Sequence, residues 1–282
     1  FIEKGYIYAE ASKGLKGNKI IFPKISVGAT INILMAAVLA KGTTEIHNAA
    51  KEPEIEDLGL CLKSMGAKIE GLGTNKILIE GVTKLKKTNY KVMLDRIEAG
   101  TYALAVAIAG GKIELVGAEK KLLTFFLNVL ETIGVEYFVT ENSIIFKRNS
   151  NSLNSIDVTT EPYPGFPTDL QAQLMAVMAI SNGTSVITEN IFENRFMHAP
   201  ELIRMGAKIK LKNNLAIVEG VKKLKGAEVM ATDLRASVSL VLAGLVAEGR
   251  TNISRTYHID RGYQDIVKKL QFCGANIKRI AV

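Results

Sequence analysis

The sequence predicts an α/β (α+β) fold of repeated units, in two lobes whose helices are buried at the centre and whose sheets lie outside. Three observations support this prediction. Two series of glycines recur at nearly constant intervals, four segments are apolar on almost every side, and a short strand-like run follows each of these segments. At 282 residues the chain is long enough for two domains, each with its own core.

The glycine series define the repeat. Glycine ends a similar phrase at four places, spaced by 68, 72 and 68 residues: Gly66, Gly134, Gly206 and Gly274. A second series precedes a strand-like run in every unit: Gly42, Gly111, Gly183 and Gly249. Because the two series keep the same interval, we predict four βαβαββ-like units, each with a buried helix, a strand, an amphipathic helix and further strands.

The first helix of each unit is expected to be buried on every side. These helices are predicted at 27–40, 100–109, 170–180 and 236–247. A helix that is apolar nearly all round cannot lie on a surface, so sheets must surround the helices. We therefore expect three sheets packed around a core of parallel helices in a complete lobe.

Polar side chains gather where these helices begin: Lys24, Ser26, Asp95, Arg96, Glu98, Thr168, Asp169, Asp233 and Arg235. Helix N-termini present unpaired N–H groups and a partial positive charge, which favour phosphate and carboxylate. The hydroxyl and carboxylate residues are equally typical of helix caps, and that interpretation stays open for each of them. Lys24 and Arg235 oppose the helix dipole unless an anion is bound, so the pattern predicts an anion-binding cleft.

Composition narrows the class of partner. The net charge is +8, from 36 basic and 28 acidic residues, and the lysines are scattered, which favours small anionic ligands. Aromatic residues are few, tryptophan is absent and no basic stripe occurs, so we do not expect a nucleic-acid partner.

Cysteine content and hydropathy indicate the compartment. Cys61 and Cys273 lack the spacing of a metal site and the density of a disulfide scaffold, which predicts a reducing, cytoplasmic setting. No signal segment opens the chain and no apolar run is long enough to span a bilayer, so no membrane partner is expected. The acidic run Glu52, Glu54 and Glu56 is interpreted as a turn and helix start, and we predict no metal.

Five phrases are more specific than these patterns. They are KISVGAT (24–30), NAAKEPEIED (48–57), FPTDLQAQ (166–173), ENRFMHAPELIRMG (193–206), and ATDLRAS (231–237) with YHIDRGY (257–263). Together they closely resemble the UDP-N-acetylglucosamine 1-carboxyvinyltransferase family, and the resemblance runs from about residue 5 to about residue 280. These enolpyruvyl transferases catalyse the first committed step of peptidoglycan synthesis. The chain departs from the family pattern mainly at 92–94, where the family often has proline.

The resemblance implies an inside-out α/β prism of two lobes, each with three repeats related by pseudo-threefold symmetry and with the substrates between them. Four units then correspond to the remaining part of the first lobe, 1–94, and the whole second lobe, 95–282. About 140 residues are expected upstream. The family's general acid, a cysteine or aspartate on a mobile loop, lies in that part, so we expect the 282-residue chain alone to be inactive or nearly so.

The resemblance also assigns roles to single residues. It implies that Lys24, Ile25, Ser26 and Val27 contact the UDP part of the nucleotide sugar. Asp169 matches the general base for the sugar 3-hydroxyl, and Ile191, with Phe192, matches a segment that contacts the sugar. Arg235 and Arg261 match arginines that bind phosphoenolpyruvate, with Arg195 and Asp233 as supporting residues. His198 and His258 receive no catalytic role.

The implied reaction adds the 3-hydroxyl of UDP-N-acetylglucosamine to phosphoenolpyruvate and then eliminates phosphate, with no cofactor. Three alternatives stay open. The chain could be a catalytically silent module that binds a nucleotide sugar, or a shikimate-phosphate enolpyruvyl transferase, which shares the repeat fold. An RNA-end-processing enzyme of related fold is the third, although its motifs and a basic stripe are missing.

Overall fold

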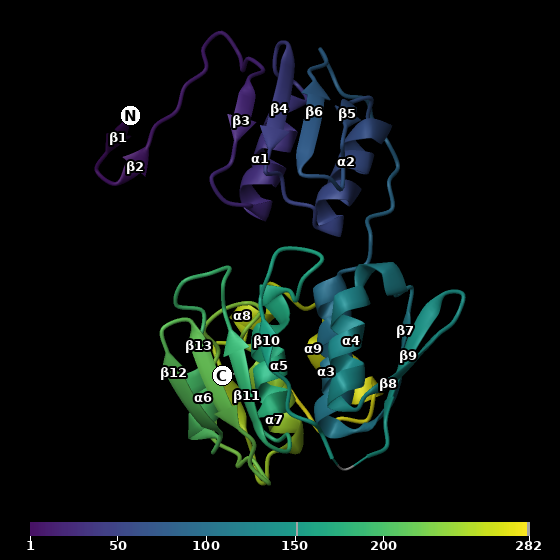
Figure 1. Cartoon of the computed structure of the whole chain (residues 1–282), viewed down its shortest axis with the longest axis vertical. Coiled ribbons are helices and arrows are strands. Elements are labelled where there is room, and N and C mark those ends of the chain that lie inside the picture. Colours follow the sequence, from purple (N-terminus) through teal and green to yellow (C-terminus); the bar gives the residue numbers. More distant parts are fainter. Residues whose placement is uncertain (151, 281–282) are drawn as a thin grey trace. The chain divides into compact units, whose positions relative to one another are not determined.

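The computed structural model describes residues 1–150 and 152–280 and separates into two compact units, Phe1–Met93 and Leu94–Val282 (Figure 1). Both units mix helices with several small sheets, so the predicted α/β class is confirmed. In the described part of the chain, every helix is too short or too polar to cross a bilayer.

The first unit contains one complete repeat. Its elements are β3 (Lys19–Ile21), α1 (Val27–Ala37), β4 (Thr43–His47), α2 (Pro53–Ser64), β5 (Lys68–Glu70) and β6 (Lys76–Glu80). The sheet order is β3-β4-β6-β5, with β3 parallel to β4 and the other pairs antiparallel. A separate hairpin, β1 (Ile2–Glu3) and β2 (Tyr6–Ile7), precedes it.

The second unit contains three sheets, one for each repeat. The first repeat has α3 (Arg96–Ala109), β7 (Gly111–Val116), η1 (Lys120–Leu122), α4 (Thr124–Ile133), β8 (Glu136–Val139) and β9 (Ser143–Arg148). The second has β10 (Val158–Thr159), η2 (Thr168–Leu170), α5 (Gln171–Met178), β11 (Thr184–Thr188), α6 (Ala199–Arg204), β12 (Lys208–Lys212) and β13 (Leu215–Glu219). The third has β14 (Glu228–Met230), α7 (Val238–Val246), β15 (Asn252–Ser254), α8 (Tyr257–Asp260) and α9 (Ile266–Phe272).

Sheet topology confirms the repetition. The order β10-β11-β13-β12 reproduces β3-β4-β6-β5 strand for strand, including the single parallel pair. The sheet β7-β9-β8 keeps the antiparallel part of that pattern, and β14-β15 keeps the parallel pair. Each parallel pair in these sheets is connected through a helix, α1, α5 or α7, because parallel strands need a crossover connection.

Helices α3, α5 and α7 form the core of the second unit and pack against one another. Every residue of α5 is buried, and eleven of the fourteen residues of α3 are buried. Gly100 of α3 faces the buried Leu170, the last residue of η2: a Cβ on Gly100 would lie 2.5 Å from Leu170 Cδ1. The prediction of helices surrounded by sheets is confirmed for this unit.

The same prediction is wrong for α1. Only Thr30, Leu34 and Ala37 of this helix are buried, and Met35 is 44% exposed. The helix packs on one sheet and on α2, whereas each core helix of the second unit also has two sibling helices beside it. Apolar sequence alone does not bury a helix on every side, because burial also needs neighbouring elements.

Candidate functional site

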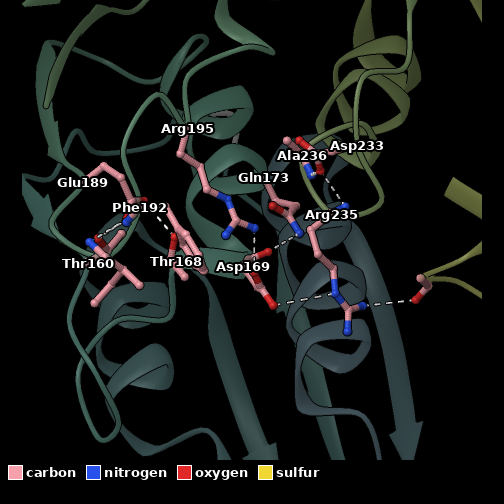
Figure 2. Close-up of polar contacts among 12 residues, drawn as sticks. Thr160, Thr168, Asp169, Gln173, Glu189, Phe192, Arg195, Asp233, Arg235 and Ala236 are labelled. Atoms are coloured by element: carbon pink, nitrogen blue, oxygen red, sulfur yellow. Dashed lines mark hydrogen bonds and ion pairs between the residues drawn. The ribbon is translucent and has the colours of Figure 1, made fainter. Parts of the chain in front are cut away.

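Asp169 lies in η2, immediately before α5, and faces two arginines (Figure 2). Arg195 Nη2 donates a 2.6 Å hydrogen bond to Asp169 Oδ1, and Arg235 Nε lies 3.8 Å from Asp169 Oδ2. The backbone carbonyl of Asp169 accepts a 2.8 Å hydrogen bond from Gln173 Nε2, one turn along the chain. The carboxylate is therefore oriented from both sides, and its side chain stays 36% exposed, so a ligand hydroxyl can reach it.

Arg235 lies between β14 and α7 and contacts several elements of the second unit. Its Nη2 donates to Asp95 Oδ2 at 3.1 Å, its Nη1 donates to the Gly262 carbonyl at 3.1 Å, and its guanidinium carbon lies 5.4 Å from the Tyr263 ring centroid. Burial by itself would lower the pKa of Arg235, but Asp95, through its charge and its hydrogen bond, together with Tyr263 and Asp169, raises the pKa above its ordinary value. The arginine is thus a fixed cation held at several points.

These contacts revise one sequence-based inference. Arg235 was expected to oppose the helix dipole unless an anion is bound, but the carboxylates of Asp95 and Asp169 balance it within the protein. An anionic ligand at Arg235 would therefore have to compete with Asp95 for the same guanidinium.

Two further predicted residues lie near Arg235. Asp233 Oδ1 accepts hydrogen bonds from the backbone N–H groups of Arg235, at 2.8 Å, and Ala236, at 2.6 Å, so it folds the turn that presents the arginine. Arg261 directly follows α8 and precedes Gly262, whose carbonyl contacts Arg235. The Arg261 side chain is exposed, and in the described part of the chain no carboxylate lies within ion-pair distance of it.

Ile191 and Phe192 begin the loop that carries Arg195. Their backbone N–H groups donate to Glu189 Oε1 at 2.9 and 3.1 Å, and the Arg195 guanidinium stacks 4.7 Å from the Phe192 ring centroid. Phe192 itself is 54% exposed. Glu189 is a site residue that sequence reasoning missed, because an acidic residue after a strand-like run gives no sign that it is buried.

In the first unit, the predicted binding segment forms the N-terminus of α1. Ser26 caps this helix: its Oγ accepts a 3.2 Å hydrogen bond from the Ala29 N–H, which confirms the capping interpretation. Lys24, Ile25 and Ser26 are exposed, and no carboxylate in residues 1–150 and 152–280 lies within ion-pair distance of the Lys24 ammonium. The segment therefore presents a cation beside exposed backbone N–H groups, an arrangement that suits a phosphate.

His198 is a buried titratable residue beside the site. It is fully buried, and within the described residues neither ring nitrogen has a hydrogen-bond partner. Burial lowers the pKa of His198 from 6.5 to about 4; the Asp233 charge opposes this shift and the Arg195 charge adds to it. His198 is therefore neutral in the folded protein near neutral pH.

This lowered pKa predicts acid sensitivity. Between pH 6.5 and about 4, His198 becomes protonated in the unfolded chain but not in the folded chain. The free energy of unfolding therefore decreases by about 3 kcal/mol as the pH is lowered across this range. Urea unfolding of the full-length protein at pH 7.5 and pH 5, compared with His198→Leu, would measure it. Between pH 7.5 and pH 5, His198→Leu should lose less unfolding free energy than wild type. The control His258→Gln should lose as much as wild type. An equal loss in His198→Leu and wild type would contradict the prediction.

No group of three or more histidine, cysteine, aspartate and glutamate side chains is arranged to hold a metal in the described residues. The site consists of the carboxylate of Asp169 and the guanidinium groups of Arg195 and Arg235. The exposed Arg261 directly precedes Gly262, whose carbonyl contacts Arg235. Such a set can accept a proton from a hydroxyl and can bind a phosphate or carboxylate.

The sequence is similar to a known protein family and to named bacterial proteins. The family model described as EPSP synthase (3-phosphoshikimate 1-carboxyvinyltransferase) matches residues 1–270. Two similar proteins are named UDP-N-acetylglucosamine 1-carboxyvinyltransferase: one from Caulobacter sp. (strain K31), 57% identical over 279 residues, and one from Agrobacterium fabrum (strain C58 / ATCC 33970), 58% identical over 281 residues. The matches cover 99% of this chain but only 65% of each relative.

Two solved structures are also similar. The enolpyruvyl transferase NikO from Streptomyces tendae has a TM-score of 0.82 at 27% identity, over 89% of this chain and 60% of NikO. EPSP synthase from Acinetobacter baumannii has a TM-score of 0.69 at 23% identity, over 94% of this chain and 64% of that chain. The second likeness concerns the fold alone.

Proposed function

Because the chain belongs to the EPSP synthase family, we propose that its protein transfers the enolpyruvyl group of phosphoenolpyruvate to the 3-hydroxyl of UDP-N-acetylglucosamine and releases phosphate. This would be the first committed step of peptidoglycan synthesis, in the cytoplasm. One observation carries the proposal. Asp169 lies between Arg195 and Arg235 in a chain that is 57% identical to a relative named UDP-N-acetylglucosamine 1-carboxyvinyltransferase. The chain spans about 65% of the length of such relatives, so the proposal concerns the full-length protein.

Asp169 is proposed as the general base. Arg195 occupies Oδ1, which leaves Oδ2 to accept the proton of the sugar hydroxyl as its oxygen attacks C2 of phosphoenolpyruvate. A general acid protonates C3, and the product is a tetrahedral phospho-lactyl adduct. Elimination breaks the C2–O bond to phosphate and removes a proton from C3, which leaves the enolpyruvyl ether.

Arg235 and Arg261 are proposed to bind the phosphate and carboxylate of phosphoenolpyruvate. A guanidinium fork pairs with either anion through two parallel hydrogen bonds, and its fixed charge stabilises negative charge that develops during addition and elimination. Asp233 is proposed to support this role by holding the turn of Arg235.

In the first unit, Lys24–Val27 are proposed to bind the UDP part of the nucleotide sugar. Lys24→Gln should raise KM for UDP-N-acetylglucosamine about 10- to 100-fold with little change in kcat, because it removes one charge-assisted contact to phosphate. Steady-state kinetics on the full-length protein at two ionic strengths would measure this. Lys41→Gln, at another exposed lysine of the same unit, is the control; equal effects of the two substitutions would contradict the assignment.

The proposed function is tested by phosphate release from phosphoenolpyruvate by the full-length protein. Release that requires UDP-N-acetylglucosamine supports the proposal. Release with shikimate 3-phosphate instead would indicate the shikimate-phosphate reaction, and binding of the nucleotide sugar without any release would indicate a silent binding module.

A further inference from the structure

Glu189 is a buried carboxylate that follows β11 and accepts four hydrogen bonds. Its Oε1 accepts from Thr160 Oγ1 at 2.9 Å and from the N–H groups of Ile191 and Phe192, at 2.9 and 3.1 Å. Its Oε2 accepts from Thr168 Oγ1 at 2.9 Å. The residue is 3% exposed, and a buried charge is tolerated only when hydrogen bonds replace its lost hydration. The two oxygens therefore hold different elements: Oε1 holds the loop that starts at Ile191, and Oε2 holds η2.

These contacts belong to a closed ring (Figure 2). Thr168 precedes Asp169 in η2, and Asp169 pairs with Arg195. Arg195 stacks on Phe192, and the Phe192 N–H returns to Glu189. Because the ring is closed, η2 cannot shift relative to the loop unless a contact to Glu189, the Asp169–Arg195 pair or the Arg195–Phe192 stack is broken.

We propose that Glu189 is a positioning residue that fixes the Asp169 carboxylate relative to the Ile191–Phe192 backbone. The inference rests on the proposed function, in which the loop contacts the sugar and Asp169 takes the proton of its hydroxyl. One carboxylate then sets both the position of the sugar and the position of its base. A displacement of about 1 Å in such an alignment costs up to about 100-fold in rate.

Two matched substitutions separate this role from simple structural support. Thr168→Val and Thr160→Val each delete one hydroxyl that donates to Glu189 at the same 2.9 Å, but only Thr168 adjoins Asp169. Thr160 is fully buried and also accepts from the Asn190 N–H at 2.9 Å, so its loss should cost at least as much stability.

In the full-length protein, we expect Thr168→Val to lower kcat about 10- to 100-fold, and Thr160→Val to lower it much less. Thr168→Ser keeps the hydroxyl and should restore kcat. Glu189→Gln, which keeps the shape but removes the charge, should both lower kcat and raise KM for the nucleotide sugar. Equal loss of kcat in Thr168→Val and Thr160→Val, or an unchanged kcat in Thr168→Val, would overturn the proposal.

A double-mutant cycle with Asp169→Asn measures whether the effects of the two substitutions on kcat are coupled. A purely structural role of Thr168 would give no such coupling. If Thr168 acts through the Asp169 carboxylate, Thr168→Val should have little further effect on kcat once Asp169 is Asn. Full additivity would overturn the positioning role. Phosphate release by the wild-type protein, and its dependence on the nucleotide sugar, test the proposed function separately. If the function is wrong, wild type shows no such release; if only the inference is wrong, wild type is active but Thr168→Val behaves like Thr160→Val.

Discussion

Asp169→Asn in the full-length protein is expected to lower kcat for phosphate release about 100- to 10,000-fold, the range that a positioned general base contributes. The amide keeps the size of the side chain and can still accept a hydrogen bond from Arg195, which lies 2.6 Å from Oδ1 in the wild-type structure. What it loses is the basic oxygen, Oδ2, that faces Arg235. KM for UDP-N-acetylglucosamine should therefore change far less than kcat.

Initial rates across a range of both substrates would measure this separation. Asp157→Asn is the matched control, because Asp157 is exposed in the same repeat and only caps the Val186 N–H, at 2.7 Å. It should leave kcat close to wild type. A kcat for Asp169→Asn within about tenfold of wild type would contradict the assignment of Asp169 as the base.

Arg235→Lys is expected to lower kcat/KM for phosphoenolpyruvate about 100- to 1,000-fold, equivalent to about 3 to 4 kcal/mol. Lysine keeps the charge but cannot reproduce the planar fork that contacts Asp95 and the Gly262 carbonyl and that would pair with a ligand anion in place of Asp95. It also removes the planar group stacked against Tyr263. KM for the nucleotide sugar should change little, because Arg235 is proposed to bind phosphoenolpyruvate and not the nucleotide sugar.

The matched control is Arg204→Lys, at an arginine whose side chain is 60% exposed and whose ion pair with Glu201 is 3.6 Å long. Its kinetics should resemble those of wild type, because lysine keeps the charge at this exposed position. A similar loss for Arg204→Lys, or an unchanged KM for phosphoenolpyruvate in Arg235→Lys, would contradict the role of Arg235.

The repeat spacing was enough to predict the fold class because each unit obeys the same local rules. Glycines Gly66, Gly134, Gly206 and Gly274 all have positive φ, from 93° to 100°, a conformation that glycine adopts without strain. Helix boundaries were less accurate. Helix α3 begins at Arg96, four residues earlier than predicted, because Asp95 caps the N–H groups of Ile97 and Glu98.

Asp169, Asp233 and Arg235 could be singled out from the sequence because they are charged residues near predicted helix starts, whereas Arg195 and Arg261 were singled out only by the phrases in which they lie; the roles of all five stay predictions. Sequence could not reveal that Asp95 neutralises Arg235, since the two lie 140 positions apart. Nor could it reveal Glu189, whose importance comes from four donors that meet only after folding. Contacts between distant segments are what a periodic pattern does not encode.

The close approach of α3 to Leu170 has a genetic consequence. Leu170 is fully buried and directly follows Asp169, so any side chain at Gly100 must push Leu170 out of its place and disturb the carboxylate beside it. A random-mutagenesis screen for loss of activity should therefore recover substitutions at Gly100, even though this residue has no side chain with which to touch a ligand. Suppressors should map to position 170, where a smaller residue makes room for the new one.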